Sequence, residues 1–242
     1  MPGRVAPAVQ TGLPAVQPLC VVRPDPLPGG GRGRPGGGES SSRGPPVHPP
    51  GQAACPSSGA VPAAVPGTTL PGGDPPRTRP PGIADERTQL LGWLDLQRAL
   101  VPYKCAGLSD VDARRSLLPG SPAMTVAGLV SHLRWVEHCW FQVLFLDRGR
   151  RANPQFGDVP DADFQVDGIP LPRLLEEYAH ECAASDAVVA AASLDDRGRN
   201  REHGADSLSL RWILGHMVEE VARHVGHLDL LREMADGEKS YY

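Results

Sequence analysis

The sequence predicts an all-α protein, a four-helix bundle preceded by a disordered N-terminal tail. Proline and glycine gather in residues 1–82, which hold 20 of the 27 prolines and 16 of the 28 glycines. Beyond residue 82, four segments repeat apolar residues with the 3.6-residue period of an α-helix. No segment there alternates apolar and polar residues over a convincing strand length. Four amphipathic segments without a strand pattern are typical of a four-helix bundle.

The tail and the remaining residues are expected to behave as separate parts. Residues 1–82 have no periodic apolar pattern, so we expect them to be disordered. Residues 83–242 are long enough to form one domain with its own core. The tail carries a charge of +4 and the remainder −8, which give the net charge of −4. The arginines of the tail are scattered and have no aromatic neighbours, so we expect no binding to nucleic acid.

Composition also bears on the compartment. No run of 18 apolar residues exists, so we expect no membrane span. Prolines at positions 7, 14 and 18 interrupt every candidate apolar core of a signal peptide. The five cysteines are odd in number and form no Cys-x-x-Cys, which argues against a disulfide framework. We therefore expect a cytoplasmic protein in a reducing environment.

Start and stop signals bound the four expected helices. The first is expected to be kinked or ended by Pro102, and Thr125 is a good N-cap for the second. Pro172 is tolerated in the first turn of the third, and Gly237 follows the fourth as a stop. The fourth begins at about Ser207 or Ser209. The expected helices span about residues 85–103, 125–147, 171–194 and 207–236.

The last helix, with the segment LGHMVEEVARHVGHLDLLR, carries a carboxylate and an imidazole that turn toward the core. At about 100° per residue, Glu220 falls on the edge of the apolar stripe and His224 falls inside it. Both are costly to bury unless something pairs with them. A metal ion would satisfy both, and so would a simple hydrogen-bonded Glu–His pair.

A third candidate ligand lies on the second helix. His132 borders the apolar stripe there and completes a set of two histidines and one carboxylate with Glu220 and His224. Three protein ligands leave a position open, as catalytic zinc, nickel or non-haem iron requires. His216 and His227 flank the set on the same face, and we expect them to be second-shell or cavity residues. The sequence assigns no catalytic residue.

Other histidines are not expected to belong to the site. His138 points away from the stripe that holds His132, which predicts a surface residue. Glu177 and His180 form a Glu-x-x-His like that of di-iron bundles. Both lie opposite the apolar stripe of their helix and no second such motif faces inward, so the di-iron interpretation is discarded.

The connection between the second and third helices, residues 148–169, is longer than an ordinary loop. It is either a functional cover or loosely ordered, and Phe156 and Phe164 are candidates to close over the cavity. Its three arginines either attract a carboxylate-bearing thiol or form a solvated basic cluster. They are Arg148, Arg150 and Arg151.

The folded part resembles the DinB-like (YfiT-type) four-helix metalloprotein superfamily, in the branch called mini-circle protein or domain of unknown function. The resemblance covers about residues 84–237. It rests on the segments ERTQLLGWLDLQRA, LVSHLRWVEHCWF and LRWILGHMVEEVARHVGHLDLLRE. The proline-rich tail has no counterpart in this superfamily.

The superfamily pattern places a histidine in the second helix and a His or Glu followed four residues later by His in the fourth. This pattern falls on His132, Glu220 and His224. The Glu variant is also found in relatives of the mycothiol-dependent maleylpyruvate isomerase. Many members have His-x-Gly-Gln where this chain has His224-Val-Gly-His227, a change that leaves the ligand intact but alters the cavity wall.

The resemblance implies a divalent metal that activates a low-molecular-weight thiol for transfer or isomerisation. Zinc is the expected metal, with nickel or iron as alternatives, and mycothiol is the expected thiol. The implied partners are a small-molecule thiol and an electrophile, and a homodimer is compatible with this interpretation. The alternatives are a metal-water hydrolase, an iron oxygenase, or a non-catalytic metal-binding stress or sensor protein.

Overall fold

The computed structural model of the chain describes residues 78–239. The expected tail, residues 1–82, lies outside the described residues except for its last five. These last residues contact the first helix, because Gln89 Nε2 donates a hydrogen bond to the Pro81 carbonyl. A Cβ atom added to Gly92 would lie 2.6 Å from Cβ of Pro80, so the two residues pack closely. The boundary between residues 82 and 83 stays a prediction.

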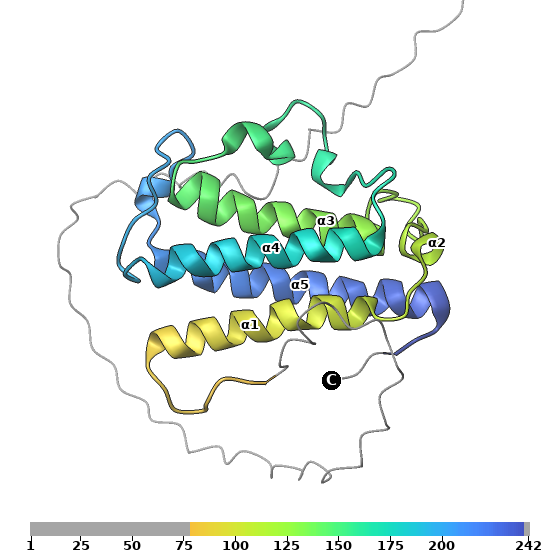
Figure 1. Ribbon diagram of the computed structural model, residues 1–242, viewed down its shortest axis with the longest axis horizontal. Helices are drawn as coiled ribbons and strands as arrows, with labels where there is room; N and C mark the ends of the chain where they lie inside the picture. Colours follow the sequence, from red (N-terminus) through yellow and green to blue (C-terminus); the bar gives the residue numbers. More distant parts are fainter. Residues whose placement is uncertain (1–77, 240–242) are drawn as a thin grey trace, which may run out of the picture. The chain divides into compact units, whose positions relative to one another are not determined.

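Four long helices form the bundle in the described part of the chain, and the all-α fold is confirmed (Figure 1). They are α1 (Glu86–Cys105), α3 (Val126–Glu137), α4 (Leu171–Ala190) and α5 (Leu210–Asp236). The short helix α2 (Asp110–Ala113), which the sequence pattern did not predict, lies between α1 and α3. The described residues contain no strand, and no described helix is long and apolar enough to cross a membrane.

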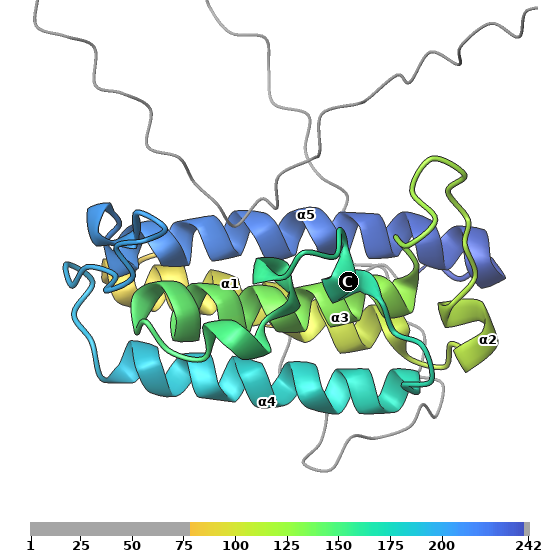
Figure 2. The ribbon, with the colours of Figure 1, turned by 90° about the horizontal axis from the view of Figure 1, so that it is seen from above.

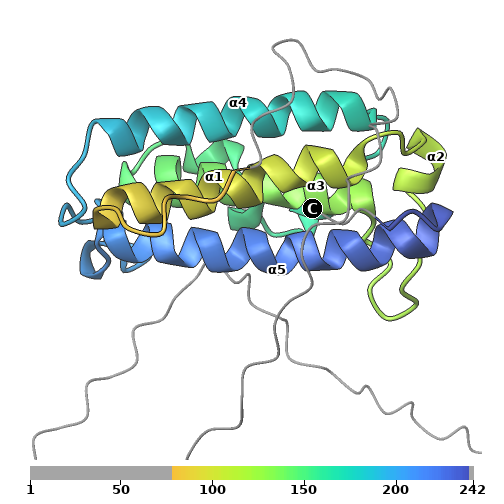
Figure 3. The same ribbon diagram turned by 90° about the horizontal axis from the view of Figure 1, so that it is seen from below.

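The order of the helices in the bundle differs from their order along the chain. Helix α1 packs against α5, and α3 packs against both α4 and α5. Seen from above and below, α4 and α5 lie on either side of the pair formed by α1 and α3 (Figures 2 and 3). The colours show that α3 and α4 run in the same direction, opposite to α1 and α5. This arrangement places the inner faces of α3 and α5 next to each other.

Parallel neighbours require a connection that returns along the bundle, which explains the length of residues 148–169. The connection is built from three short 3₁₀ turns: η2 (Arg150–Ala152), η3 (Pro154–Phe156) and η4 (Ala162–Phe164). It lies against α3, and η4 contacts that helix directly. Of the two alternatives expected for this segment, the structure has the ordered cover.

The expected N-cap Thr125 is present, and Ser209, one of the two expected starts, caps α5. The side chains of Asp85, Thr125 and Ser209 each accept a hydrogen bond from a backbone N–H three residues later. Gly237 ends α5 with a φ of 82°, a left-handed conformation that favours glycine. Pro102 does not end α1, which continues through it to Cys105, and the alternative of a kink at Pro102 stays a prediction.

Helix α3 was expected to remain α-helical to about residue 147, but it becomes a π-helix, η1 (His138–Phe145). As at the end of any helix, the last carbonyl groups of η1 need partners from outside the helix. Arg199 N donates to the Phe145 carbonyl at 2.9 Å, and Asn200 N donates to Leu144 at 3.1 Å. The loop before α5 therefore fastens onto the end of η1, a long-range pairing that no local pattern predicts.

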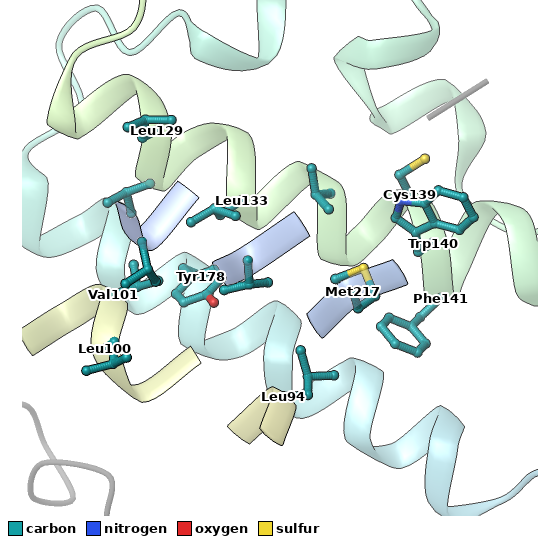
Figure 4. Packing of buried hydrophobic residues seen from close by; sticks show 14 of the residues in the cluster. Leu94, Leu100, Val101, Leu129, Leu133, Cys139, Trp140, Phe141, Tyr178 and Met217 are labelled. Carbon is teal, nitrogen blue, oxygen red and sulfur yellow. The ribbon is translucent and has the colours of Figure 1, made fainter. Parts of the chain in front are cut away.

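The core lies between the four long helices (Figure 4). It is mainly apolar, but it includes a buried ion pair in which Arg98 of α1 forms two 2.7 Å hydrogen bonds to Glu137 of α3. Arg98 is 7% exposed and Glu137 is 0% exposed. The buried apolar side chains labelled in Figure 4 include Leu100, Leu129, Leu133, Tyr178 and Met217.

Candidate metal centre

Three side chains from the facing helices α3 and α5 meet in the interior of the bundle. One possible ligand atom each from His132, Glu220 and His224 lie within 4.8 Å of one another. Glu220 Oε1 lies 3.4 Å from His132 Nε2 and 3.2 Å from His224 Nε2. The three residues are 7%, 2% and 6% exposed, respectively. The structure therefore brings together the three residues that the sequence pattern selected.

Their placement follows from the helical spacing. Glu220 and His224 are one turn apart on α5, and the buried residues Met217, Val221 and Leu228 continue the same face. Thus a helix that buries its apolar stripe also buries these two polar side chains. Burial of a carboxylate disfavours its charge, but the hydrogen bonds from His132 and His224 hold the pKa of Glu220 well below its usual range.

The second oxygen of Glu220 has no matching donor. Glu220 Oε2 is buried without a hydrogen bond, although Arg223 Nη1 lies 3.5 Å away. Arg223 supplies a charge nearby but no hydrogen bond, and a cation bound directly at this oxygen would complete its environment. The donor set of two imidazole nitrogens and a carboxylate suits zinc, nickel or iron. The residues present therefore fit a divalent cation.

A residue that the sequence pattern missed supports His132 from behind. Asp163 Oδ2 lies 2.6 Å from Nδ1 of His132, and Gln155 Nε2 donates to the same oxygen at 2.9 Å. Burial opposes protonation of His132, but its hydrogen bonds and charge interactions with Asp163 and Glu220 outweigh burial and raise its pKa to about 9. The pKa of Asp163 is lowered despite burial, because it pairs with His132. Asp163 fixes the orientation of the ring and leaves Nε2 facing the triad.

One of the two expected aromatic covers lies on the site. The ring of Phe164 stacks on His132 with centroids 4.4 Å apart and planes 16° apart. Phe156 instead packs against His203, with a centroid distance of 4.9 Å. Phe164 therefore shields the His132 ring, whereas Phe156 contacts the loop that precedes α5.

The two flanking histidines have different surroundings. His227 Nδ1 lies 3.3 Å from Nδ1 of His224, and burial lowers the pKa of His227. His216 packs between Trp140 and Trp212, at centroid distances of 4.4 and 5.5 Å. Burial lowers the pKa of His216 as well. Of these two histidines, His227 is the one that contacts the triad.

The remaining candidates lie outside the triad. His138 is half-buried against Trp135 and Asn153, so the prediction of a surface residue was wrong. The folded connection covers it, which helical periodicity alone could not indicate. Glu177 forms an ion pair with Arg134, and His180 is exposed, in agreement with discarding the di-iron interpretation.

Comparison with known proteins gives a family. A family model described as mycothiol-S-transferase matches residues 89–237. No curated protein matches the chain. The family match confirms the resemblance to DinB-like proteins with a link to mycothiol, and it leaves the mini-circle branch untested. The chain belongs to the mycothiol-S-transferase family.

Proposed function

We propose that the protein is a divalent-metal-dependent transferase that joins the sulfur of mycothiol to a small electrophile. The observation that carries this proposal is the convergence of His132, Glu220 and His224 within 4.8 Å, in a member of a mycothiol-S-transferase family. In the overall reaction a carbon–sulfur bond forms, the leaving group departs from the electrophile, and the thiol proton passes to solvent.

His132, Glu220 and His224 would hold the cation, with zinc as the preferred metal and nickel or iron as alternatives. Three ligands from the protein leave a position open to the thiol. A bound divalent cation supplies a lowered thiol pKa, so that the nucleophilic thiolate forms near neutral pH.

Both imidazoles of the triad have an acceptor behind them. Asp163 accepts the Nδ1–H of His132 over 2.6 Å, and His227 Nδ1 lies 3.3 Å from the corresponding nitrogen of His224. The lowered pKa of His227 favours its neutral form, which can accept that hydrogen bond. In this arrangement both ligand rings carry their proton on Nδ1 and turn Nε2 toward Glu220.

The cover has a distinct role. Phe164 lies flat on the His132 ring, and its neighbour Asp163 holds that ring in place. The connection between η1 and α4 thus excludes water from one side of the triad and orients a ligand at the same time. Exclusion of water strengthens the electrostatic interactions among the triad side chains.

A conjugation assay tests the proposal. The purified full chain is incubated with mycothiol and an aryl chloride, with and without zinc or a chelator, and the thioether is quantified. We expect conjugation that a chelator abolishes, that zinc restores and that His224→Ala lacks, whereas His138→Ala retains it. Chelator-sensitive ester hydrolysis without thiol, in place of conjugation, would favour the hydrolase alternative. Metal binding without any turnover would favour the non-catalytic one.

A further inference from the structure

We infer that the protein has a second binding site, for an amphipathic organic anion, at the end of the bundle where α4 ends and α5 begins. A cavity of about 780 Å³ lies there between the end of η1, the C-terminal half of α4 and residues 196–199. Phe145 at its wall is separated from His132 by roughly 15–20 Å of helix. The inference does not depend on the proposed metal chemistry.

Three arginines line this cavity, and no residue that the structure describes pairs with their guanidinium groups. Arg148, Arg197 and Arg199 form no side-chain hydrogen bond or ion pair with any residue in the range 78–239. Of the other arginines whose side chains are described, only Arg79 shares this state. The others contact carboxylates or backbone carbonyls: Arg87, Arg98, Arg114, Arg115, Arg134, Arg150, Arg173, Arg201, Arg211, Arg223 and Arg232. Thus three of the four described arginines that lack a partner among residues 78–239 line one cavity, in a domain with excess negative charge.

Another cavity, beside η2 and η3, shows why it matters whether the arginines already form ion pairs. That cavity, of about 700 Å³, also contains two arginines. Arg134 forms an ion pair with Glu177, and Arg150 pairs with Glu202 at 2.5 Å, so their charges are already compensated. The cavity that Arg148, Arg197 and Arg199 line includes one carboxylate, Asp196, which accepts a hydrogen bond from Ser193 N at 2.8 Å. Three positive charges against one leave an excess that suits an anion.

The backbone around the arginines is fixed before any ligand arrives. Arg148 N donates to the Gln142 carbonyl at 2.8 Å, and Arg199 N donates to the Phe145 carbonyl at 2.9 Å. Gly198 packs so closely that an added Cβ atom would lie 2.6 Å from the Ala205 carbonyl oxygen. These contacts fasten both sides of the cavity to η1 and reduce the entropy lost on binding.

Apolar side chains complete the chemistry of the site. Phe145, Leu146 and Val188 line the cavity together with two alanines of α4 and two that follow it. Guanidinium groups bind carboxylates and phosphates through paired hydrogen bonds, and the apolar lining favours an aromatic or aliphatic body. A ligand with an anionic head and an apolar body of one or two rings matches both features.

Calorimetric titration of the full chain with naphthyl phosphate tests this inference. The chain is first treated with chelator, so that binding cannot involve a metal ion. We expect saturable binding, and we expect inorganic phosphate and neutral naphthol each to bind at least about tenfold more weakly. Naphthoate serves as a second probe that shows whether the site prefers a phosphate or a carboxylate head.

Variants locate the binding. Arg197→Ala/Arg199→Ala should weaken naphthyl phosphate binding by about tenfold or more, and Arg148→Ala on the opposite side should act in the same direction. Arg201→Ala is the matched control, because Arg201 lies on the same loop but does not line the cavity. Thermal unfolding checks that each variant is folded. If the double variant is unfolded, naphthyl phosphate binding by Arg148→Ala tests the inference in its place. Equal binding of naphthol and naphthyl phosphate, or equal losses in Arg201→Ala and the cavity variants, would overturn the inference.

Discussion

Asp163 Oδ2 lies 2.6 Å from Nδ1 of His132, although the two residues are 31 positions apart and come from different elements. The carboxylate approaches the ring from the side opposite Glu220, which contacts Nε2. Because the carboxylate accepts a hydrogen bond from Nδ1–H, it fixes which nitrogen of His132 remains free to bind a cation. The loop between η1 and α4 thereby becomes part of the candidate metal centre.

Asp163→Ala should reduce the affinity for zinc by about 10- to 100-fold, the usual effect of losing such a support. Zinc affinity is measured by competition with a chromophoric chelator. Asp158→Ala is the matched control, because Asp158 is an exposed acid in the same connection. An unchanged affinity in Asp163→Ala would show that His132 needs no acceptor behind it.

His227 should be replaceable by glutamine but not by alanine. The amide oxygen of His227→Gln can accept the Nδ1–H of His224, whereas His227→Ala leaves that group without its acceptor. We therefore expect near-normal zinc affinity in the first variant and a loss of about tenfold in the second. Equal losses in both variants would contradict the orienting role. His216→Ala should leave zinc affinity unchanged, because His216 packs between two tryptophans instead of contacting the triad.

Metal affinity should increase with pH up to about pH 9. In the metal-free protein, Asp163 and Glu220 raise the pKa of His132 to about 9 from the usual 6.5, although burial opposes this. The interaction of protonated His132 with these two carboxylates makes its full contribution to the stability of the metal-free fold below pH 6.5. This contribution is lost as pH rises through about 9. A cation needs the neutral ring, so binding releases this proton and affinity should rise about tenfold per pH unit below pH 9. A zinc affinity that is flat between pH 7 and 9 would contradict the raised pKa.

The buried ion pair between Arg98 and Glu137 should be important for stability. Arg98→Met leaves the carboxylate of Glu137 fully buried without its partner, which should lower the free energy of unfolding by about 3–5 kcal/mol. Arg115→Met removes a half-exposed arginine that lies 3.5 Å from Asp112, and its effect should stay below about 1 kcal/mol. Urea denaturation monitored by circular dichroism measures both. A loss below about 1 kcal/mol in Arg98→Met would show that water or Asp186 compensates for the missing partner.

The sequence could predict features that depend on local periodicity. Helical spacing alone placed Glu220 and His224 on the buried face of α5, and His132 on the inner face of α3. Capping chemistry placed the start of α3 at Thr125 and left Ser207 and Ser209 as alternatives for the start of α5, of which the structure has Ser209. These features need only the residues within a few turns of one helix.

Features that depend on long-range packing could not be predicted in this way. Asp163 lies in a connection without periodicity, and only the unusual length of that segment indicated a function. The carbonyl groups at the end of the π-helix η1 accept hydrogen bonds from residues 199–200, which are distant in sequence. His138 became half-buried because the same connection folds over it. Each of these follows from a contact between elements, and a single helical wheel carries no information about such contacts.

A zinc titration of the metal-free full chain shows whether His132, Glu220 and His224 together hold a divalent cation. We expect one ion per chain, a higher melting temperature with zinc, and loss of most of the affinity in His224→Ala. Glu220→Gln should bind more weakly than the native chain because it removes the anionic ligand. A native chain that binds no zinc, nickel or iron, and whose melting temperature none of them raises, would contradict the proposed metal site and leave the triad as a buried hydrogen-bonded cluster.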